Sequence, residues 1–414
     1  MKRIFLFGTF SLFIANIVYM LSGYGANIFL AKTLGVANYG IYAVVVSLIS
    51  LVIMIFSSGL NGAISRLISK NQEKSEEIKK AGFKLSAISG IVLFTTYFLS
   101  ADIIAQILND SSLGSLIRIS SIMIPIYFLY PVFLGYFNGL QKYSEQAIIT
   151  ISYSITKFCL IFLLVLLGFS VLGAVIGFAI APLSVLIAGS YFSKTKKTKK
   201  VFNMLKILKL AIPITIFSFL FESSFTLSLF SVKSILIHNY FVGQYSAILQ
   251  VARLPYYLTM ALSGALFPLV SESFSNKKIV ELRSHLIKTS KYFVFFILTT
   301  AIIIFVFSFQ ILSVFFGEEF ALASPSLQIL SLASVFVALF YILCIILIAI
   351  EKEKYSVTIS FSVLIIAWLS NLILIPLFSL SGAALATFVA FFSGSVIAAG
   401  LVIKFMLKQS EVHA

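Results

Sequence analysis

Several charged side chains lie inside long apolar stretches of this sequence, where an ionisable group needs a physical reason to be present. Lys157 and Glu222 fall near the middle of such stretches, and Arg253 falls about a third of the way into another. Lys233 and Arg118 lie nearer the ends of theirs. A charge at the centre of a bilayer costs at least about 2.5–3.5 kcal/mol, so these groups must face a partner or a water-filled cavity. Four bases against so few acids predict a cationic site for phosphate or acidic sugar groups.

Each of these residues also has a structural interpretation. Arg118 and Lys233 are close enough to the ends of their stretches for their side chains to reach the membrane surface. Glu222 could neutralise Lys157 or Arg253 in a buried pair, or it could bind and release a proton in an ion-coupled cycle. Lys157 is too central to reach the surface, which favours a functional role. We expect Lys157 and Arg253 to hold an anionic group together.

The sequence predicts no metal site and no cofactor. The three histidines are scattered over an outside turn, a cytoplasmic loop and the C-terminal tail, and both Cys159 and Cys344 lie within apolar runs. Such cysteines are typical packing residues. No glycine-rich phosphate loop is present, so the sequence does not predict ATP-driven chemistry within this chain.

The elements that must position these residues are membrane-spanning helices. Of 414 residues, 60% are hydrophobic and only 11% are charged, whereas soluble domains have about 25% charged residues. The class is therefore an all-α polytopic membrane protein. At about 20 apolar residues per span, the sequence predicts about twelve spans: 5–30, 39–63, 84–108, 116–140, 147–168, 171–193, 210–233, 243–270, 292–316, 327–350, 356–378 and 381–405.

Lys and Arg gather in alternate gaps between these spans. The termini and the gaps on their side hold 25 of the 30 basic residues, whereas the gaps on the other side hold only Lys32. Cytoplasmic loops carry such an excess, so both termini and the basic linker at 194–209 are predicted to be cytoplasmic. The net charge of +16 then indicates anionic membrane lipids as partners rather than nucleic acid.

The chain contains an internal repeat of six spans. Similar short segments recur about 203 to 212 residues apart: Ser58-Gly59 with Ser263-Gly264, Gln141-Lys142-Tyr143-Ser144 with Lys352-Glu353-Lys354-Tyr355-Ser356, and Leu172-Gly173-Ala174 with Ser381-Gly382-Ala383-Ala384. An even number of spans gives both copies the same orientation, related by an axis along the membrane normal. We expect an N-terminal lobe at 1–200 and a C-terminal lobe at 201–414, which is a transporter plan.

A short hairpin carries a family resemblance. Leu30-Ala31-Lys32-Thr33-Leu34-Gly35, followed by Tyr39-Gly40-Ile41-Tyr42, resembles the "LAR-LG-EEYG-Y" hairpin of the polysaccharide exporters and O-antigen (Wzx-type) flippases. These belong to the multidrug/oligosaccharidyl-lipid/polysaccharide (MOP) superfamily. Ala261-Leu262-Ser263-Gly264-Ala265-Leu266-Phe267-Pro268 is similar to the family's eighth-helix ending, and Gly382-Ala383-Ala384 also fits. The resemblance implies a MATE-like fold.

The resemblance also implies a function. The substrate would be an undecaprenyl-diphosphate-linked oligosaccharide, such as an O-antigen or capsule repeat unit. It would be moved from the cytoplasmic to the periplasmic leaflet of the bacterial inner membrane. A polysaccharide polymerase and a chain-length regulator would be protein partners. Two alternatives remain open: a membrane enzyme of polysaccharide assembly and a small-molecule exporter of the same fold. A membrane enzyme would usually need a large outside loop, which this sequence does not predict. Related drug exporters carry a carboxylate in the first helix, and the first span of this sequence has none.

Overall fold

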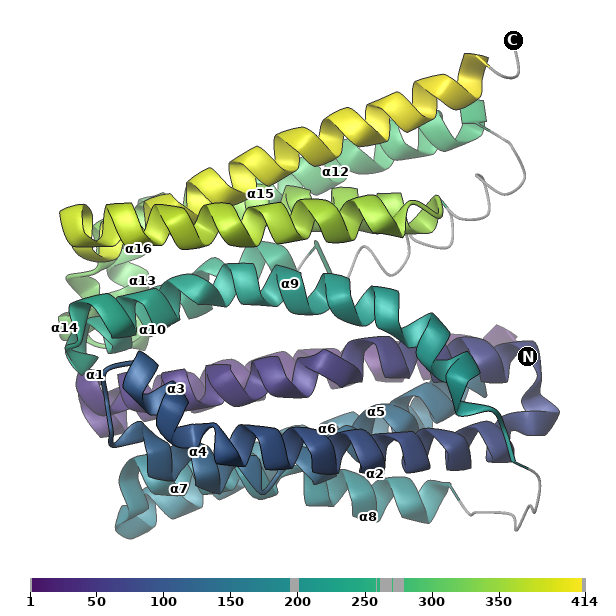
Figure 1. Cartoon of the computed structure of the whole chain (residues 1–414), viewed down its shortest axis with the longest axis horizontal. Helices are drawn as coiled ribbons and strands as arrows, with labels where there is room; N and C mark the ends of the chain where they lie inside the picture. The colour runs from purple at the N-terminus through teal and green to yellow at the C-terminus, as the bar shows by residue number, and fades with distance from the viewer. Residues whose placement is uncertain (1, 194–200, 258, 261–269, 271–278, 412–414) are drawn as a thin grey trace. The chain divides into compact units, whose positions relative to one another are not determined.

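The computed structural model describes residues 2–193, 201–257, 259–260, 270 and 279–411, and in these residues all regular secondary structure is helical (Figure 1). The elements are α1 (Lys2–Lys70), η1 (Gln72–Lys74), α2 (Ser75–Leu99), α3 (Ala101–Ile107), α4 (Leu113–Ser121), α5 (Ile124–Gly139), α6 (Tyr143–Leu164), the π-helical η2 (Val165–Phe169), α7 (Ser170–Ile180), α8 (Pro182–Phe192), α9 (Met204–Leu236), α10 (Asn239–Ala252), α12 (Ile279–Val306), α13 (Ser308–Phe315), α14 (Glu318–Ala321), α15 (Ser324–Ala349) and α16 (Glu353–Glu411).

Most of these helices are long and apolar enough to cross a membrane. Within the described residues, six continuous helical stretches meet that test, and up to eight do if two bent pairs each count as one span. The bends are 44° between α4 and α5 and 73° between the 293–306 part of α12 and α13. Three of the six stretches exceed 49 residues, roughly twice what one span needs. Each of those three contains a break in its backbone.

The first break lies in the hairpin that the sequence singles out. Gly35 has φ 74° and ψ 169°, which interrupts α1 between its two apolar halves. Only glycine adopts such angles without strain. The second and third breaks lie at Gly168 and Ser170, around η2, and at Ser379 in α16. These positions match the predicted boundaries between spans five and six and between spans eleven and twelve.

Unusual backbone angles recur at the spacing of the sequence repeat. Ser170 has φ 48° and ψ −134°, and Ser379 has φ 53° and ψ −129°. Four such pairs of positive-φ residues stand about one repeat apart: Gly35 with Ile237, Asn109 with Gly317, Gln141 with Glu351, and Ser170 with Ser379. A non-glycine residue at positive φ is uncommon. These matching positions therefore indicate that the backbone bends at corresponding places in the two halves of the chain.

The glycine that follows each of these serines has a packing reason. A Cβ added to Gly173 would lie 3.0 Å from the carbonyl oxygen of Leu164, and one added to Gly382 would lie 2.0 Å from that of Leu374. Each glycine therefore lets the helix after the break lie against the end of the helix before it. This explains why Gly173-Ala174 and Gly382-Ala383 repeat in the sequence.

The chain divides into two compact units, Met1–Phe219 and Leu220–Ala414, with the division inside α9. In the first unit, α1 packs on α5 and α6, and α2 packs on α5. In the second unit, α15 packs on α16 and on α12, around buried rings that include Phe221, Phe340 and Phe391. The lobe boundaries at 1–200 and 201–414 remain a prediction.

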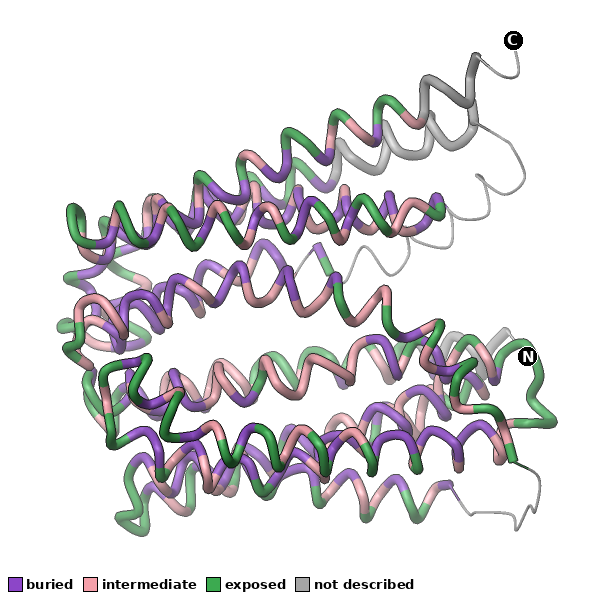
Figure 2. Tube along the Cα trace, in the orientation of Figure 1, coloured by how far each residue is buried: buried purple, intermediate pink, exposed green. Residues whose placement is uncertain are grey.

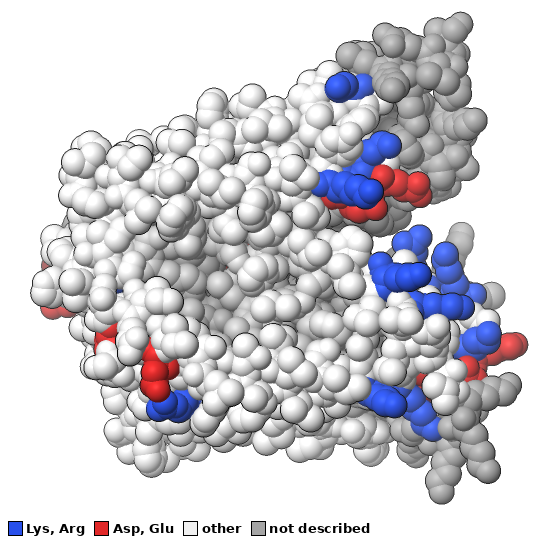
Figure 3. All heavy atoms as spheres, in the orientation of Figure 1, with Lys and Arg blue, Asp and Glu red and all other residues white. Residues whose placement is uncertain are grey.

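The helix surfaces fit a lipid environment. Exposed and buried residues alternate along the helices in Figure 2, and many exposed side chains are large and apolar, such as Leu99, Ile187 and Leu377. On the face drawn in Figure 3, uncharged side chains dominate and most of the visible Lys and Arg lie along one edge of the view. Large exposed apolar surface is what the hydrocarbon core of a bilayer accepts.

Some sequence predictions fall outside the described residues. They include the motif at 261–268, the Ser263-Gly264 copy of the repeat and residues 194–200 of the linker. The predicted eighth span, 243–270, is described over α10 and a few residues beyond it. The predicted span 84–108 covers the later part of α2 and all of α3. Each of the other predicted spans falls on a described apolar helix, a half of a continuous helical stretch, or a bent pair.

Candidate functional site

Lys157 is a buried cation without an anionic partner in the described part of the chain. It lies on α6, and 8% of it is exposed. Its Nζ lies 5.1 Å from the ring centroid of Tyr19, on α1, and 5.4 Å from that of Tyr153. Cation–π contacts contribute up to about 2 kcal/mol each when desolvated. They do not satisfy the three N–H donors of an ammonium group, and no described residue accepts a hydrogen bond from Lys157.

A cluster of tyrosines holds this cation in place. The Tyr127 hydroxyl donates to the carbonyl oxygen of Phe178 at 3.2 Å, which leaves the Tyr153 hydroxyl to donate to Tyr127 at 2.9 Å. The Tyr153 ring also stacks on Tyr130, with centroids 5.6 Å apart. Helices α5, α6 and α7 are thereby connected through their aromatic side chains. Tyr153 precedes Lys157 by four residues, one turn of α6, so its fixed ring orients the ammonium group.

Arg253 has a different environment in the second unit. It lies just after α10, and its Nη2 is 2.6 Å from Oε1 of Glu222 on α9. Arg253 also donates to the Thr226 hydroxyl at 3.2 Å, and its guanidinium carbon is 5.3 Å from the centre of the Phe225 ring. Arg253 therefore already has an anion. The sequence leaves two roles open for Glu222, a buried ion pair and proton coupling. The structure contains the ion pair, and its partner is Arg253 rather than Lys157.

Lys233 and Arg118 also have local partners. Lys233, 1% exposed, donates to the side-chain oxygen of Asn239, which opens the next helix. Arg118 forms an ion pair with Asp102 that links α4 to α3, and both side chains are substantially exposed, at 42% and 61%. The Arg118 guanidinium also lies over the Phe98 ring. Arg118 is exposed enough to reach the membrane surface, whereas Lys233 is buried and does not reach it. A substrate-binding role for either base remains a prediction.

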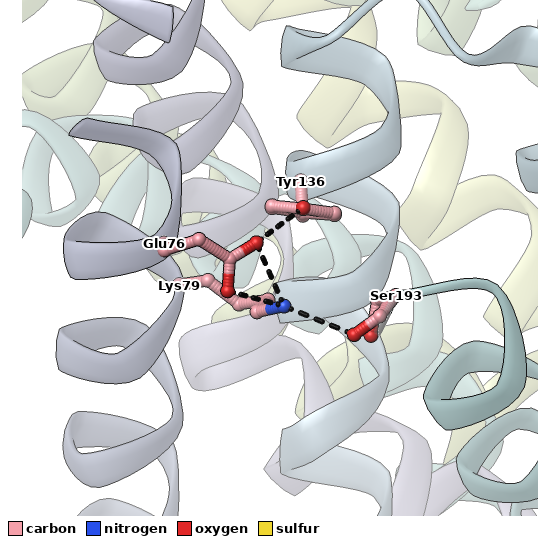
Figure 4. A network of polar contacts seen from close by, with 4 residues as sticks. All are labelled: Glu76, Lys79, Tyr136 and Ser193. Carbon is pink, nitrogen blue, oxygen red and sulfur yellow. Dashed lines mark hydrogen bonds and ion pairs between the residues drawn. The ribbon is translucent and has the colours of Figure 1, made fainter. Parts of the chain in front are cut away.

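The structure adds a buried network that the sequence did not indicate. The sequence places Lys79 in a basic gap between two predicted spans, among the charges that predict topology. In the structure it is only 1% exposed. Its Nζ lies 2.9 Å from Oε2 of Glu76 and donates to the carbonyl oxygen of Ser193 at 3.2 Å (Figure 4). Tyr136 donates to Glu76 at 2.6 Å. The network ties α2 and α5 to the end of α8, and the Glu76–Lys79 spacing of three residues was its only sequence signal.

Two further observations concern the whole set of charged residues. In the described part of the chain, no three His, Cys, Asp or Glu side chains gather as metal ligands would. Lys157 belongs to the first unit and Arg253 to the second. Their joint action on one anion therefore remains a prediction.

Solved structures with the same fold are membrane transporters. An inward-facing multidrug resistance MATE family transporter of the MOP superfamily superposes with a TM-score of 0.79 at 16% identity, over 96% of each chain. The lipid II flippase MurJ in its inward closed conformation gives 0.77 at 18% identity, over 96% of this chain and 89% of MurJ. This protein is therefore a multi-pass membrane protein with the same helical fold as MATE transporters and MurJ.

The sequence comparison gives the family. Residues 5–274 match the family described as "Polysaccharide biosynthesis protein", and residues 213–373 also match the MatE family. Since the first match covers well over half of the chain, the chain belongs to the polysaccharide biosynthesis protein family. The solved structures that share this fold are a transporter and a flippase rather than enzymes, in line with the sequence prediction.

Two characterised relatives are similar to this chain over most of its length. The stage V sporulation protein B of Bacillus subtilis is 22% identical over 352 residues, which cover 77% of this chain and 68% of that protein. The probable low-salt glycan biosynthesis flippase Agl15 of Haloferax volcanii is 24% identical over 393 residues, covering 93% of this chain and 81% of Agl15.

Proposed function

We propose that this protein is a flippase for a lipid-linked oligosaccharide. It moves an undecaprenyl-diphosphate-linked glycan, such as an O-antigen or capsule repeat unit, from the cytoplasmic to the periplasmic leaflet of the bacterial inner membrane. Membership of the polysaccharide biosynthesis family supports the glycan, and similarity to Agl15 and to the MurJ fold supports lipid-linked transport. Polysaccharide polymerase and chain-length regulator are the proposed protein partners, and both termini are cytoplasmic.

The observation that carries this proposal is the unneutralised Lys157 inside the first unit. Its burial is unfavourable unless an anion approaches, and a diphosphate or an acidic sugar supplies one. Binding such a group midway through the membrane, while the lipid tail stays in the bilayer, is what a flippase working by alternating access requires. Arg253 is the second proposed base, and Glu222 beside it is the candidate for ion coupling.

A small-molecule exporter is the second candidate, favoured by the MatE match at residues 213–373. Exporters of cationic drugs need an acidic group in the transport path. The first acidic residue of this chain is Glu73, so the whole of α1 has none. An uncompensated lysine repels a cation. These charges favour the glycan substrate.

Complementation of a deletion strain tests the proposal. Loss of the gene should abolish surface glycan, and the wild-type gene should restore it. Lys157→Met, which removes the charge but keeps the length, should restore little, and Lys157→Arg should restore part of it because the charge remains. Lys32→Met, on an exposed lysine of α1, is the matched control. Full surface glycan in the deletion strain itself would refute the function.

A further inference from the structure

Tyr19 has a partly exposed aromatic ring beside the buried ammonium group of Lys157. It lies on α1, and 46% of it is exposed, although its ring stacks on the buried Tyr153 with centroids 6.1 Å apart. The Lys157 Nζ is 5.1 Å from the Tyr19 ring centroid. A partly exposed ring therefore lies next to a cation for which the described residues supply no hydrogen-bond acceptor, and both belong to one unit.

Tyr19 lies on the side of α1 that also carries the exposed polar residue Asn16. At 100° per residue, Asn16, Tyr19 and Gly23 share one face of the helix, whereas the exposed Phe13, Ile17 and Leu21 lie on another. Asn16 is also exposed. Helix surfaces that face the hydrocarbon core are predominantly apolar. The Asn16–Tyr19 face is therefore suited to a ligand that hydrogen-bonds as well as stacks.

Gly23 allows the lysine to come close to this face. A Cβ added at Gly23 would lie 4.0 Å from the Lys157 Nζ. The absence of a side chain there leaves the ammonium group beside the backbone of α1, one turn from Tyr19. Lys157 keeps 8% of its surface exposed, and its ammonium group is in contact with the partly exposed Tyr19 ring.

We infer that Tyr19 and Lys157 form a subsite for a sugar that carries an anionic group. This inference rests on the proposed function and names the part of the substrate recognised. The anion, a phosphate or a carboxylate, accepts hydrogen bonds from the Lys157 ammonium group. The C–H groups on one face of the sugar ring carry partial positive charge and pack on the negative face of the Tyr19 ring. Asn16 lies on the same helix face, within one turn, where it can hydrogen-bond sugar hydroxyls.

Binding of small probes to the full chain in nanodiscs tests the subsite. Saturation-transfer NMR would compare a hexose 1-phosphate, a hexuronate, the neutral methyl hexoside and inorganic phosphate. We expect the wild type to bind one of the two charged sugars more tightly than either the neutral sugar or phosphate alone. A preference for the hexose 1-phosphate identifies a phosphate as the anion, and a preference for the hexuronate identifies a carboxylate. Equal binding of all four probes would overturn the subsite.

Variants separate the two contributions. Tyr19→Leu should weaken binding of the preferred charged sugar about 3- to 10-fold, the range expected for loss of one aromatic stacking contact, and should leave inorganic phosphate unchanged. Tyr19→Phe should bind like the wild type, which also guards against misfolding as an explanation. Lys157→Met should lose the advantage of charged over neutral sugar. Tyr191→Leu, on another exposed tyrosine of the same unit, is the control.

Parallel measurement of surface glycan separates failure of the subsite from failure of the function. If export depends on the gene but Tyr19→Leu binds the charged sugars as tightly as the wild type, the subsite is wrong and the flippase proposal stands. If export does not depend on the gene, the proposed function fails. Loss of sugar binding in Tyr191→Leu equal to that in Tyr19→Leu would also overturn the subsite.

Discussion

At the scale of the residue, the two intramembrane bases differ in what surrounds them. Lys157 contacts aromatic rings and has no acid among the described residues, whereas Arg253 is paired with Glu222 at 2.6 Å. A base that is already paired binds an incoming anion only by sharing or giving up its own carboxylate. Lys157 is thus the stronger candidate for first contact with the substrate. The Arg253–Glu222 ion pair is the candidate for a contact that breaks and re-forms during the transport cycle.

Substitution of Glu222 tests both roles of that pair. Glu222→Gln leaves Arg253 largely buried without its anion, a loss on the order of 3 kcal/mol, so the variant should unfold at lower temperature. The double variant Glu222→Gln/Arg253→Gln should recover part of that loss. Thermal unfolding followed by size-exclusion chromatography measures both. Equal stabilities of wild type and single variant would contradict the buried pair.

The Glu222→Gln variant also addresses ion coupling. If Glu222 binds and releases a proton during transport, export of glycan by a folded Glu222→Gln variant should no longer respond to dissipation of the proton gradient. A folded variant that keeps the wild-type response would show that the pair is structural only.

At the scale of the element, the breaks between paired helices explain why small residues repeat. Gly382 has the closest approach, because an added Cβ would lie 2.0 Å from a backbone oxygen and backbone cannot yield as a flexible side chain does. Gly382→Ala should therefore lower the unfolding temperature. Gly400→Ala is the control, since nothing lies within 4 Å of its added Cβ and alanine favours a helix by up to about 1 kcal/mol. Equal destabilisation by both would contradict the packing account.

The sequence predicted these elements better than it predicted the site. Apolar length places the spans, and Gly35 in the predicted hairpin marks the first break, because both signals are local. The Glu222–Arg253 pair joins residues 31 positions apart on separate helices, and no local pattern encodes that contact. The sequence places Lys79 in the gap before the predicted span 84–108, whereas α2 already begins at Ser75, before the apolar run. Asp102 and Arg118 could have been paired, since both lie near the same ends of consecutive predicted spans.

At the scale of the whole molecule, the alternation of basic gaps predicts topology. A periplasm-dependent alkaline phosphatase fused after Lys408 should be inactive, because the positive-inside rule places that end in the cytoplasm. The same reporter fused after Asp110, in the turn between α3 and α4, should be active. High activity after Lys408 would contradict an even number of spans.

The central claim is that this chain moves a lipid-linked glycan between leaflets, and proteoliposomes test it most directly. The liposomes would contain the purified full chain and a polyprenyl-diphosphate oligosaccharide with a fluorescent sugar, quenched by a reagent that cannot cross the bilayer. The account predicts that the wild type lets the inner-leaflet pool reach the quencher, and that Lys157→Met leaves it as protected as in protein-free liposomes. Continued protection of that pool by liposomes containing the folded wild-type chain would contradict the account.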